Sequence, residues 1–456
     1  MPQKKRVLYI AHGHPDFAYG GAEWAAYYMY ESMKDSDAYE PFFLAHYDRT
    51  QHQHAGCHLI RHEADDHVHL FSVAGHNYDH FYNTLLCGNF DYAIEPYIAF
   101  REFLESLRPD VIHFHHYLHM GIELVAYSKS VLPDLKIVMT LHEFMPICGN
   151  RGSMIKTQTN QLCFGASPLK CSGCFPERTP AEFFLRERFF KANFAHVDRF
   201  VAPSQFLQDR FVEWGLEADR FLQVDYGRPI WPKRGQSPRR EGQPFVVAFF
   251  GQIVFHKGVD VFLRAALEYR MRRKRASEQG ENKLPEVRFA VHGSMDNLTD
   301  DNVRETIHSL TEQCQDVAHV HGAYDARNMQ ALLSRVDCVV VPSKWWENSP
   351  LVIQEAFMVG VPVIASNIGG MAERVTHRVN GLQFVVGNHF DLLNQILELA
   401  GSPSLYAQLV EGIPDIISDA EMANQMHVLY DELQRESSQA HTTKPGLMSA
   451  VSKECR

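Results

Sequence analysis

Two glutamates flank a helix-start signal in the second half of the chain. Glu347 and Glu355 stand eight positions apart, and Ser349 and Pro350 lie between them. Ser349 suits the N-cap of a helix and Pro350 its first position. The unbonded N–H groups of such a helix start attract anions, and the two carboxylates could bind hydroxyl groups on either side. The spacing predicts a site for an anionic ligand, although a capped helix with two solvated glutamates would have the same sequence.

Two further loops could bring charge or flexible backbone to the same place. Lys257 lies in a strand-to-helix loop, where a lysine can serve as a point charge for phosphate. Gly369 and Gly370 follow another strand, and their amides can approach an anion closely because neither residue has a Cβ atom. Taken alone, Lys257 could equally be a solvated loop lysine.

These segments resemble the motifs of a known enzyme family. The stretch 347–355 (ENSPLVIQE) resembles the E-x7-E motif of retaining GT-B glycosyltransferases of family 4, also described as glycosyl transferases group 1. The stretch 249–258 (FFGQIVFHKG) resembles that family's F-x-G-R-x4-K-G loop, with Gln252 in place of the usual arginine. Residues 20–23 (GGAE) resemble its N-terminal glycine loop. The ordered match over residues 7–390 is specific, whereas each motif alone is weak.

The resemblance implies an α/β protein of two doubly wound, Rossmann-like domains that face a cleft, with a nucleoside-diphosphate sugar bound mainly by the second domain. It implies that Lys257 contacts the diphosphate, Glu347 the hydroxyls of the transferred sugar, and Glu355 the ribose. An amide at Gln252 would remove one positive charge from the leaving group, which affects rate or donor choice. The other donor-binding residues that the resemblance implies are Gly20, Gly21, Asn348, Ser349, Leu351, Gly369 and Gly370.

A histidine at the end of a first-half strand should face the same cleft. His142 resembles the histidine that the family places near the transferred sugar, with a core histidine as the alternative. In the absence of a clear nucleophile, the family is thought to retain configuration by front-face attack, in which the departing phosphate takes the acceptor's proton. Glu347 and His142 would orient the sugar. No catalytic metal is expected, because helix starts and Lys257 neutralise the diphosphate.

Other histidines gather in the first half. Nine of them lie between His46 and His80, but their spacing follows no fixed ligand pattern. The sequence therefore predicts a mobile polar insertion there and no metal site. Further histidines, at 113, 115, 116 and 119, end another strand, and some of them should face the cleft.

Four cysteines fall in one irregular segment, residues 148–174. Four thiolates can bind zinc tetrahedrally and staple a loop that lacks a core of its own. The gaps of fourteen, seven and two residues do not match a standard zinc finger, so two local disulfides or unligated thiols are the alternatives. Similar clusters occur in some polysaccharide-building members of the family, which implies a cysteine-cluster-containing type. The residues concerned are Cys148, Cys163, Cys171 and Cys174.

The helix pattern at 179–198 combines five phenylalanines with basic residues. Such a helix could touch a membrane that carries a lipid-linked acceptor, but these aromatic residues more often belong to a core. No run of about 18 apolar residues appears, and the first residues lack an export signal. We therefore expect a cytoplasmic protein, with peripheral contact to the inner face of the cell membrane as a further option.

Apolar strand patterns alternate with amphipathic helices, which is typical of parallel sheets covered on both faces. The pattern restarts near Phe245, after a stretch rich in Pro, Gly and Arg. We expect an acceptor-side domain at 1–225 with the cysteine insertion at 148–174, a linker at 226–244, and a nucleotide-sugar domain at 245–405. Helices at 406–436 could pack back on the first domain, and a disordered tail is expected at 437–456.

By this resemblance the protein is a hexosyltransferase-type enzyme (EC class 2.4) that moves a sugar from a nucleotide donor to a glycan, lipid-linked or other acceptor, as in polysaccharide biosynthesis. The net charge of −11 argues against nucleic acid as a partner. One alternative is a GT-B nucleotide-sugar epimerase or hydrolase. The other is a non-catalytic nucleotide-sugar-binding scaffold, which the neutral Gln252 makes conceivable.

Overall fold

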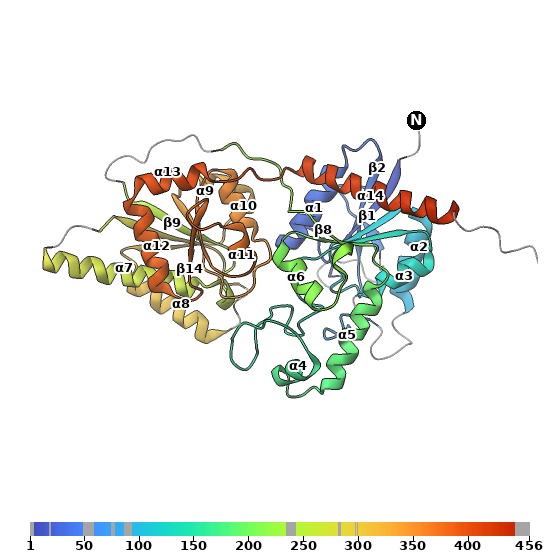
Figure 1. Ribbon diagram of the computed structural model, residues 1–456, viewed down its shortest axis with the longest axis horizontal. Helices are drawn as coiled ribbons and strands as arrows, with labels where there is room; N and C mark the ends of the chain where they lie inside the picture. The colour runs from blue at the N-terminus through green and yellow to red at the C-terminus, as the bar shows by residue number, and fades with distance from the viewer. Residues whose placement is uncertain are drawn as a thin grey trace, which may run out of the picture.

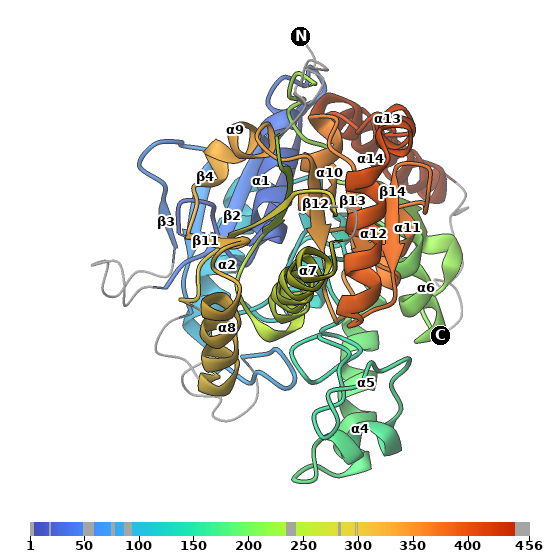
Figure 2. The ribbon, with the colours of Figure 1, turned by 90° about the vertical axis from the view of Figure 1, so that its left-hand side faces the viewer.

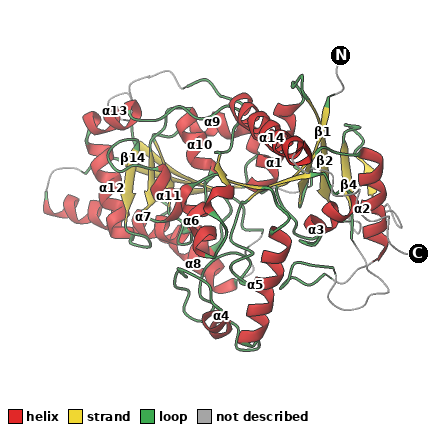
Figure 3. Ribbon diagram, turned by 45° about the vertical axis from the view of Figure 1, so that its right-hand side comes forward, coloured by secondary structure: helices red, strands yellow, loops and turns green. Residues whose placement is uncertain are grey.

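Two α/β domains lie side by side in the computed structural model (Figure 1). The structure describes residues 4–17, 20–48, 59–73, 78–85, 94–233, 243–280, 284–296, 298 and 300–442. Each domain is built on a largely parallel sheet with helices packed around it (Figure 3). This confirms the two-domain α/β architecture that the alternating strands and helices predict.

The first domain holds an eight-stranded sheet in the order β3-β4-β2-β1-β5-β6-β7-β8. All neighbours pair in parallel except β3 and β4. The mobile insertion predicted between His46 and His80 is wrong for residues 59–71, because buried Val68, Leu70 and Phe71 extend the sheet there. The strands are β1 Lys5–Ala11, β2 Tyr39–His46, β3 Leu59–Arg61, β4 Val68–Phe71, β5 Val111–Phe114, β6 Lys136–Thr140, β7 Arg199–Ala202 and β8 Phe221–Gln223.

Helices of the first domain cover this sheet, and α4 and α5 project away from it (Figures 1 and 2). The start of α5 is fixed by a capping box between Thr179 and Glu182, with Pro180 in the first turn. The helices are α1 Gly21–Met33, α2 Ile94–Leu107, α3 Leu124–Val131, α4 Pro168–Cys174, α5 Pro180–Phe194 and α6 Gln205–Glu213, with a 3-10 turn η1 Ala218–Arg220.

The second domain holds a six-stranded parallel sheet in the order β11-β10-β9-β12-β13-β14. Its strands are β9 Phe245–Phe250, β10 Val287–His292, β11 Ala318–Gly322, β12 Cys338–Val341, β13 Val363–Ser366 and β14 Gly381–Phe384. Its helices are η2 Phe255–Lys257, α7 Val259–Gln279, α8 Asp301–Gln313, η3 Ala326–Asn328, α9 Met329–Leu333, α10 Leu351–Met358, α11 Gly369–Arg374, α12 His389–Gly401 and α13 Pro403–Glu411.

The last helix, α14 Asp419–Thr442, returns to the first domain and lies along α1 (Figure 1). Its Met426 and Tyr430 are fully buried, and the Tyr430 hydroxyl lies 2.6 Å from His113 Nδ1. The preceding α13 instead packs on the second domain through Leu405 and Leu409. Because α14 runs to Thr442, the disordered tail predicted from residue 437 is wrong for its first residues. Residues 443–456 lie outside the described part of the chain.

The chain passes between the domains twice, near Arg228 and near residues 417–419, and these two segments are hydrogen-bonded to each other. The Arg228 N–H donates to the Ile417 carbonyl at 3.4 Å, and the Asp419 N–H donates to the Arg228 carbonyl at 3.1 Å. Tyr226 and Arg228 are only 7% and 6% exposed, so the start of the predicted linker is part of the packed structure. Residues 234–242 of that linker lie outside the described residues.

The aromatic helix α5 divides its side chains between core and surface. Phe183, Phe190 and Phe194 are buried, as a core helix requires, whereas Phe184 and Leu185 are 53% and 56% exposed. Across the described residues, no helix combines the length and apolar character that crossing a bilayer needs.

Candidate active site

The turn before α10 lies at the junction of the two domains. The Ser204 hydroxyl of the first domain donates to Asn348 Oδ1 at 2.6 Å, and Asn348 Nδ2 donates to the main-chain oxygen of His142 at 3.3 Å. A Cβ atom on Gly21 would lie 3.3 Å from Leu351 Cδ1. The glycine loop of the first domain and the helix start of the second domain are therefore in direct contact.

The helix begins one position later than predicted. Pro350, not Ser349, occupies the N-cap of α10, and its extended backbone makes no side-chain cap. Ser349 fails as the cap because its hydroxyl serves another network: it accepts from Arg374 Nη2 at 3.0 Å and lies 3.4 Å from Asp225 Oδ1. Arg374 also forms an ion pair with Asp225 at 2.5 Å. A cation thus stands beside the helix start.

The main-chain amides of this turn divide into free and occupied groups. Within the described residues, the N–H groups of Ser349 and Leu351 make no hydrogen bond, which leaves them available to an anion. The Gly370 N–H instead donates to the Glu347 carbonyl at 2.8 Å, and its binding of phosphate or sugar stays a prediction. A Cβ on Gly370 would lie 1.5 Å from the Asn348 oxygen, so close packing requires this glycine. Gly369 has a φ of +58° at the same turn.

Glu347 is a buried carboxylate held by three donors. Lys257 Nζ lies 2.6 Å from its Oε1, and Ser343 Oγ and Trp345 Nε1 each donate to the same oxygen at 2.8 Å. Burial opposes its ionisation, but the charge of Lys257 and the three hydrogen bonds outweigh that effect and lower the pKa of Glu347. No hydrogen bond within the described residues reaches Oε2, so this oxygen is available to a ligand hydroxyl.

Glu355, one turn into α10, is paired with a residue that the sequence motif does not contain. Its Oε1 accepts from Arg228 Nη1 at 2.6 Å, and the two side chains are 14% and 8% exposed. Gln354 Nε2 donates to the Tyr226 carbonyl at 3.3 Å beside this pair. The helix is therefore fastened to the interdomain passage at the position where the resemblance implies ribose binding.

Of the two donor-binding residues predicted in the β9–α7 loop, Lys257 and Gln252, only Lys257 lies beside Glu347. Lys257 is 30% exposed and points to Glu347. Gln252 is exposed, and within the described residues its side chain makes no hydrogen bond. The structure brings Lys257 to the helix start but not Gln252.

His142 lies in a chain of neutral hydrogen-bonding groups. Its Nδ1 lies 2.7 Å from the Tyr226 hydroxyl, and its Nε2 lies 3.1 Å from His115 Nδ1. Burial raises the pKa of Tyr226, so its hydroxyl keeps its proton and shares a neutral hydrogen bond with Nδ1. Burial and the neighbouring His115 lower the pKa of His142 well below its ordinary value. Both ring nitrogens are thus engaged within the protein, while the carbonyl of His142 meets Asn348.

A half-buried carboxyl, that of Glu143, follows His142 directly. Burial raises the pKa of Glu143 to about 8, and its Oε1 lies 3.6 Å from His116 Nε2. On the other side, His12 Nε2 lies 3.1 Å from Glu23 Oε1, and the His12 and His116 rings are 4.2 Å apart. The first-domain side of the junction is a packed array of imidazoles.

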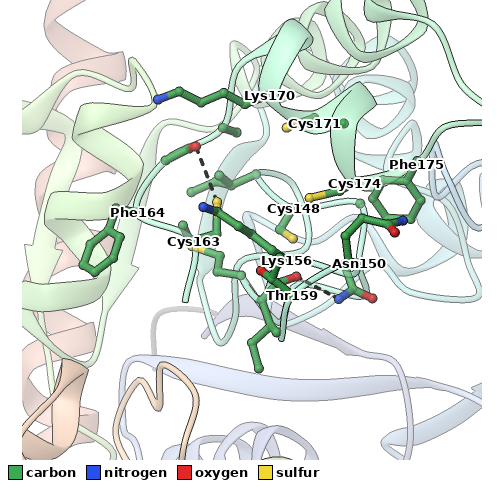
Figure 4. A pocket seen from close by; sticks show the side chains of 18 residues that line it. Cys148, Asn150, Lys156, Thr159, Cys163, Phe164, Lys170, Cys171, Cys174 and Phe175 are labelled. Carbon is green, nitrogen blue, oxygen red and sulfur yellow. Dashed lines mark hydrogen bonds between the residues drawn. The ribbon is translucent and has the colours of Figure 1, made fainter. Parts of the chain in front are cut away.

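The four cysteines of the insertion line one cavity of about 500 Å³ (Figure 4). All four are free thiols, so the two local disulfides are not formed. Among the described residues, no three of these sulfur atoms lie within 4.8 Å of one another, as three ligands of one tetrahedral zinc ion would. The geometry gives zinc no support, and zinc binding by Cys148, Cys163, Cys171 and Cys174 stays a prediction.

The insertion nevertheless touches the candidate site. Trp346, the neighbour of Glu347, donates from Nε1 to the Cys163 carbonyl at 3.0 Å. Its ring centroid lies 5.2 Å from those of Phe164 and Phe206. Two segments of the first domain therefore contact Trp346, the residue next to Glu347.

Sequence reasoning missed three residues that complete the site. Arg228 and Tyr226 were assigned to a linker, and nothing in their own segment marks them as partners of Glu355 and His142. Arg374 could have been found, because it follows Gly370 by four helical positions and so lies on the same face of α11.

Both domains have known structural counterparts. Sucrose-phosphate synthase from Thermosynechococcus elongatus matches with a TM-score of 0.67 at 18% identity, over 95% of this chain and 100% of that chain. The chain has the GT-B fold. Anabaena HepE in complex with UDP and glucose matches this GT-B chain with a TM-score of 0.60 at 16% identity, over 96% of this chain and 100% of that chain.

Sequence comparisons agree with the GT-B assignment. Residues 230–424 match the family described as Glycosyl transferases group 1, and residues 19–224 match Glycosyltransferase Family 4. Glycogen synthase from Mycobacterium tuberculosis is 25% identical over 284 residues, which covers 61% of this chain and 56% of that protein. D-inositol 3-phosphate glycosyltransferase from Mycobacterium leprae is 31% identical over 171 residues, or 36% and 35% of the two chains. The chain thus spans about half the length of these curated relatives, or less.

Proposed function

We propose that the protein is a retaining, hexosyltransferase-type glycosyltransferase that moves a sugar from a nucleoside-diphosphate sugar to a glycan or lipid-linked acceptor. The matches of both halves to glycosyltransferase families support this class. The observation that carries the proposal is the start of α10 at the domain junction. There the free N–H groups of Ser349 and Leu351 lie beside Arg374, which contacts the Ser349 hydroxyl, and beside the buried Glu347, which holds Lys257.

In this proposal the diphosphate binds at the helix start. The free amides donate to its oxygens, while Lys257 and Arg374 neutralise charge that grows on the leaving group. Lys257 already spans to Glu347, so one ammonium can contact the carboxylate and a phosphate together. Glu347 would accept sugar hydroxyls on Oε2, and Glu355 would contact the ribose. Anabaena HepE was solved with UDP and glucose, which supports a nucleotide sugar as the donor.

Retention would follow from front-face attack on the donor. The departing phosphate takes the proton of the acceptor hydroxyl, and no covalent intermediate with the protein is needed. His142 positions the sugar through its carbonyl contact with Asn348, because both of its ring nitrogens are engaged. This scheme uses no catalytic metal, and closure of the two domains excludes water from the reacting atoms.

Arg374 bears on the alternatives. The neutral Gln252 suggested a non-catalytic scaffold, because a cation on the leaving group is lost. Arg374 places a second guanidinium at the helix start, and although it is paired with Asp225 at 2.5 Å it can contact a phosphate as well, which favours catalysis. A nucleotide-sugar epimerase or hydrolase would use the same donor site and would break the donor down without an acceptor.

A thermal-shift panel of UDP-, GDP-, ADP- and TDP-sugars tests the donor site, because ligand binding to the folded state raises the melting temperature. We expect a shift with one nucleotide class that is much reduced in Lys257→Ala and Glu355→Gln. Lys274→Ala, at an 80% exposed position on α7, is the matched control. An unchanged shift in both site variants would show that the donor site is misassigned.

Peripheral membrane contact belongs to the same proposal, with the exposed Phe184 and Leu185 of α5 as its surface. Cosedimentation with anionic lipid vesicles should fall in the double variant Phe184→Ser/Leu185→Ser.

Structural zinc also remains a proposal, and it requires the four sulfur atoms to draw together within their cavity. Metal analysis of the purified protein should find zinc that is lost in Cys171→Ser and kept in Cys314→Ser.

A further inference from the structure

Three metal-ligand side chains of the first domain meet in space. His14 and Asp16 lie in the loop that follows β1, and His62 directly follows β3. His62 Nε2 lies 3.1 Å from Asp16 Oδ2, and His14 Nδ1 lies 3.7 Å from the same oxygen. One ligand atom from each residue lies within 4.8 Å of the others, and in the described part of the chain no other His, Cys, Asp and Glu group of three meets this condition.

The surroundings of His14 favour a ligand over a charged histidine. His14 is 3% exposed, and its Nε2 is buried without a hydrogen-bond partner within the described residues. Its Nδ1 faces Asp16 and accepts from the Asp16 N–H at 3.3 Å, a long hydrogen bond that coordination of an ion by this atom would replace. One ring nitrogen of His14 is therefore held by a long hydrogen bond, and the other has no partner within the described residues.

His62 and Asp16 complete an unequal set of ligands. The His62 Nδ1 accepts from the Ala64 N–H at 3.3 Å, which turns Nε2 toward Asp16. The side chains of His14 and His62 are 4% and 12% exposed, whereas that of Asp16 is 59% exposed. Two imidazoles thus form a sheltered side, and the carboxylate lies on the side open to water.

We propose that His14, Asp16 and His62 bind a divalent transition-metal ion of the Zn²⁺ type. Two imidazole nitrogens and one carboxylate oxygen are a ligand set that such ions take, and three protein ligands leave a coordination position for water. Binding would replace the contact between His62 Nε2 and Asp16 Oδ2 with bonds from both atoms to the ion. The ion would join the loop after β1 to the edge strand β3, two segments far apart in the sequence.

Cobalt(II) titration of the full chain tests this site, because Co²⁺ takes the same ligands and reports them in its absorption spectrum. We expect a bound Co²⁺ ion with visible ligand-field bands and no thiolate charge-transfer band, which separates this site from the cysteine cavity. Asp16→Asn and His62→Ala should weaken its binding by more than about 10-fold. Both positions are safer than the buried His14, whose replacement could disturb folding.

Two exposed positions outside the proposed site provide matched controls. Asp66→Asn removes an equal charge at an 87% exposed position near His62, and His308→Ala removes an exposed histidine on α8. Both should bind Co²⁺ as the parent protein does, and Co²⁺ should raise the melting temperature of the parent but not of Asp16→Asn. Binding seen only with the thiolate band, or binding unchanged in both site variants, would overturn the proposal. Loss of donor binding in Lys257→Ala is independent of either outcome.

Discussion

The two sides of the domain junction are built from different chemistry. On the second-domain side, charges come in pairs: Lys257 with Glu347, and Glu355 with Arg228. On the first-domain side, His113, His115, His116 and His142 are packed together, and burial keeps each of them neutral by lowering its pKa. Paired charges can be exchanged for those of an ionic ligand, whereas neutral imidazoles offer hydrogen bonds without attracting ions. The difference suits a diphosphate on one side and a sugar on the other.

Among the variants considered, removal of the Lys257 charge from the second-domain side should have the largest effect, which is on the rate of sugar transfer. Under the proposed function, Lys257→Ala should lower kcat for sugar transfer by about 10²–10³-fold, the range seen when one group that stabilises developing negative charge is lost. Steady-state release of the nucleoside diphosphate measures it, with Lys274→Ala as the control. If the variant keeps its kcat, Lys257 does not act on the leaving group.

The Arg228–Glu355 pair should matter chiefly for stability. Arg228→Leu leaves a buried carboxylate without its partner, which should cost about 3–5 kcal/mol of unfolding free energy. The double variant Arg228→Leu/Glu355→Leu should recover part of this loss, because no charge is then left unpaired. Urea unfolding of the three proteins makes the comparison. A double variant as unstable as the single one would mean that packing, and not charge, dominates there.

The buried histidines of the first domain should make the stability of the protein sensitive to acid. Burial lowers the pKa of His14 to about 4 and that of His113 to about 3, from an ordinary value of 6.5. The unfolded chain therefore binds more protons in this window, and stability present above pH 6.5 is lost as the pH falls toward 4. The first domain holds more of these histidines than the second, so its unfolding transition should move most. Calorimetry at about pH 7 and about pH 5 would show this, and equal midpoints would contradict it.

The smallest effect is expected at the contact between the two sides. Ser204 caps α6 and also donates to Asn348, whereas Ser402 caps α13 without reaching the other domain. Ser402→Ala should cost about 1 kcal/mol, as for a lost cap. Ser204→Ala should cost about 0.5–1.5 kcal/mol more, for the lost hydrogen bond. Equal losses in thermal unfolding would mean that the Ser204–Asn348 contact contributes nothing to stability.

The sequence predicted the features that depend on short spacing. The alternating apolar runs predicted the parallel sheets, and the stretch 347–355 predicted a helix start at a strand end, apart from the shift of the cap from Ser349 to Pro350. Gly370 was read as an anion-binding amide, but its role depends on how closely the Asn348 loop approaches it. That approach is a property of the packed domain, which a local motif does not contain.

Partners drawn from distant segments could not be predicted. Arg228 pairs with Glu355, and His62 with Asp16, because the tertiary structure brings distant segments of the chain together. The cysteine insertion shows the reverse: Cys171 and Cys174 suggested metal by their spacing, yet the sulfur atoms are spread around a cavity. Spacing in the sequence and convergence in space are thus separate properties.

The two passages of the chain that run together between the domains have a mechanical consequence. A single connection would let the lobes swivel freely, whereas two connections bonded through Arg228, Ile417 and Asp419 act as a hinge with one axis. Opening to admit substrates would then follow one path, and each closing stroke would return Leu351 to the same place against Gly21.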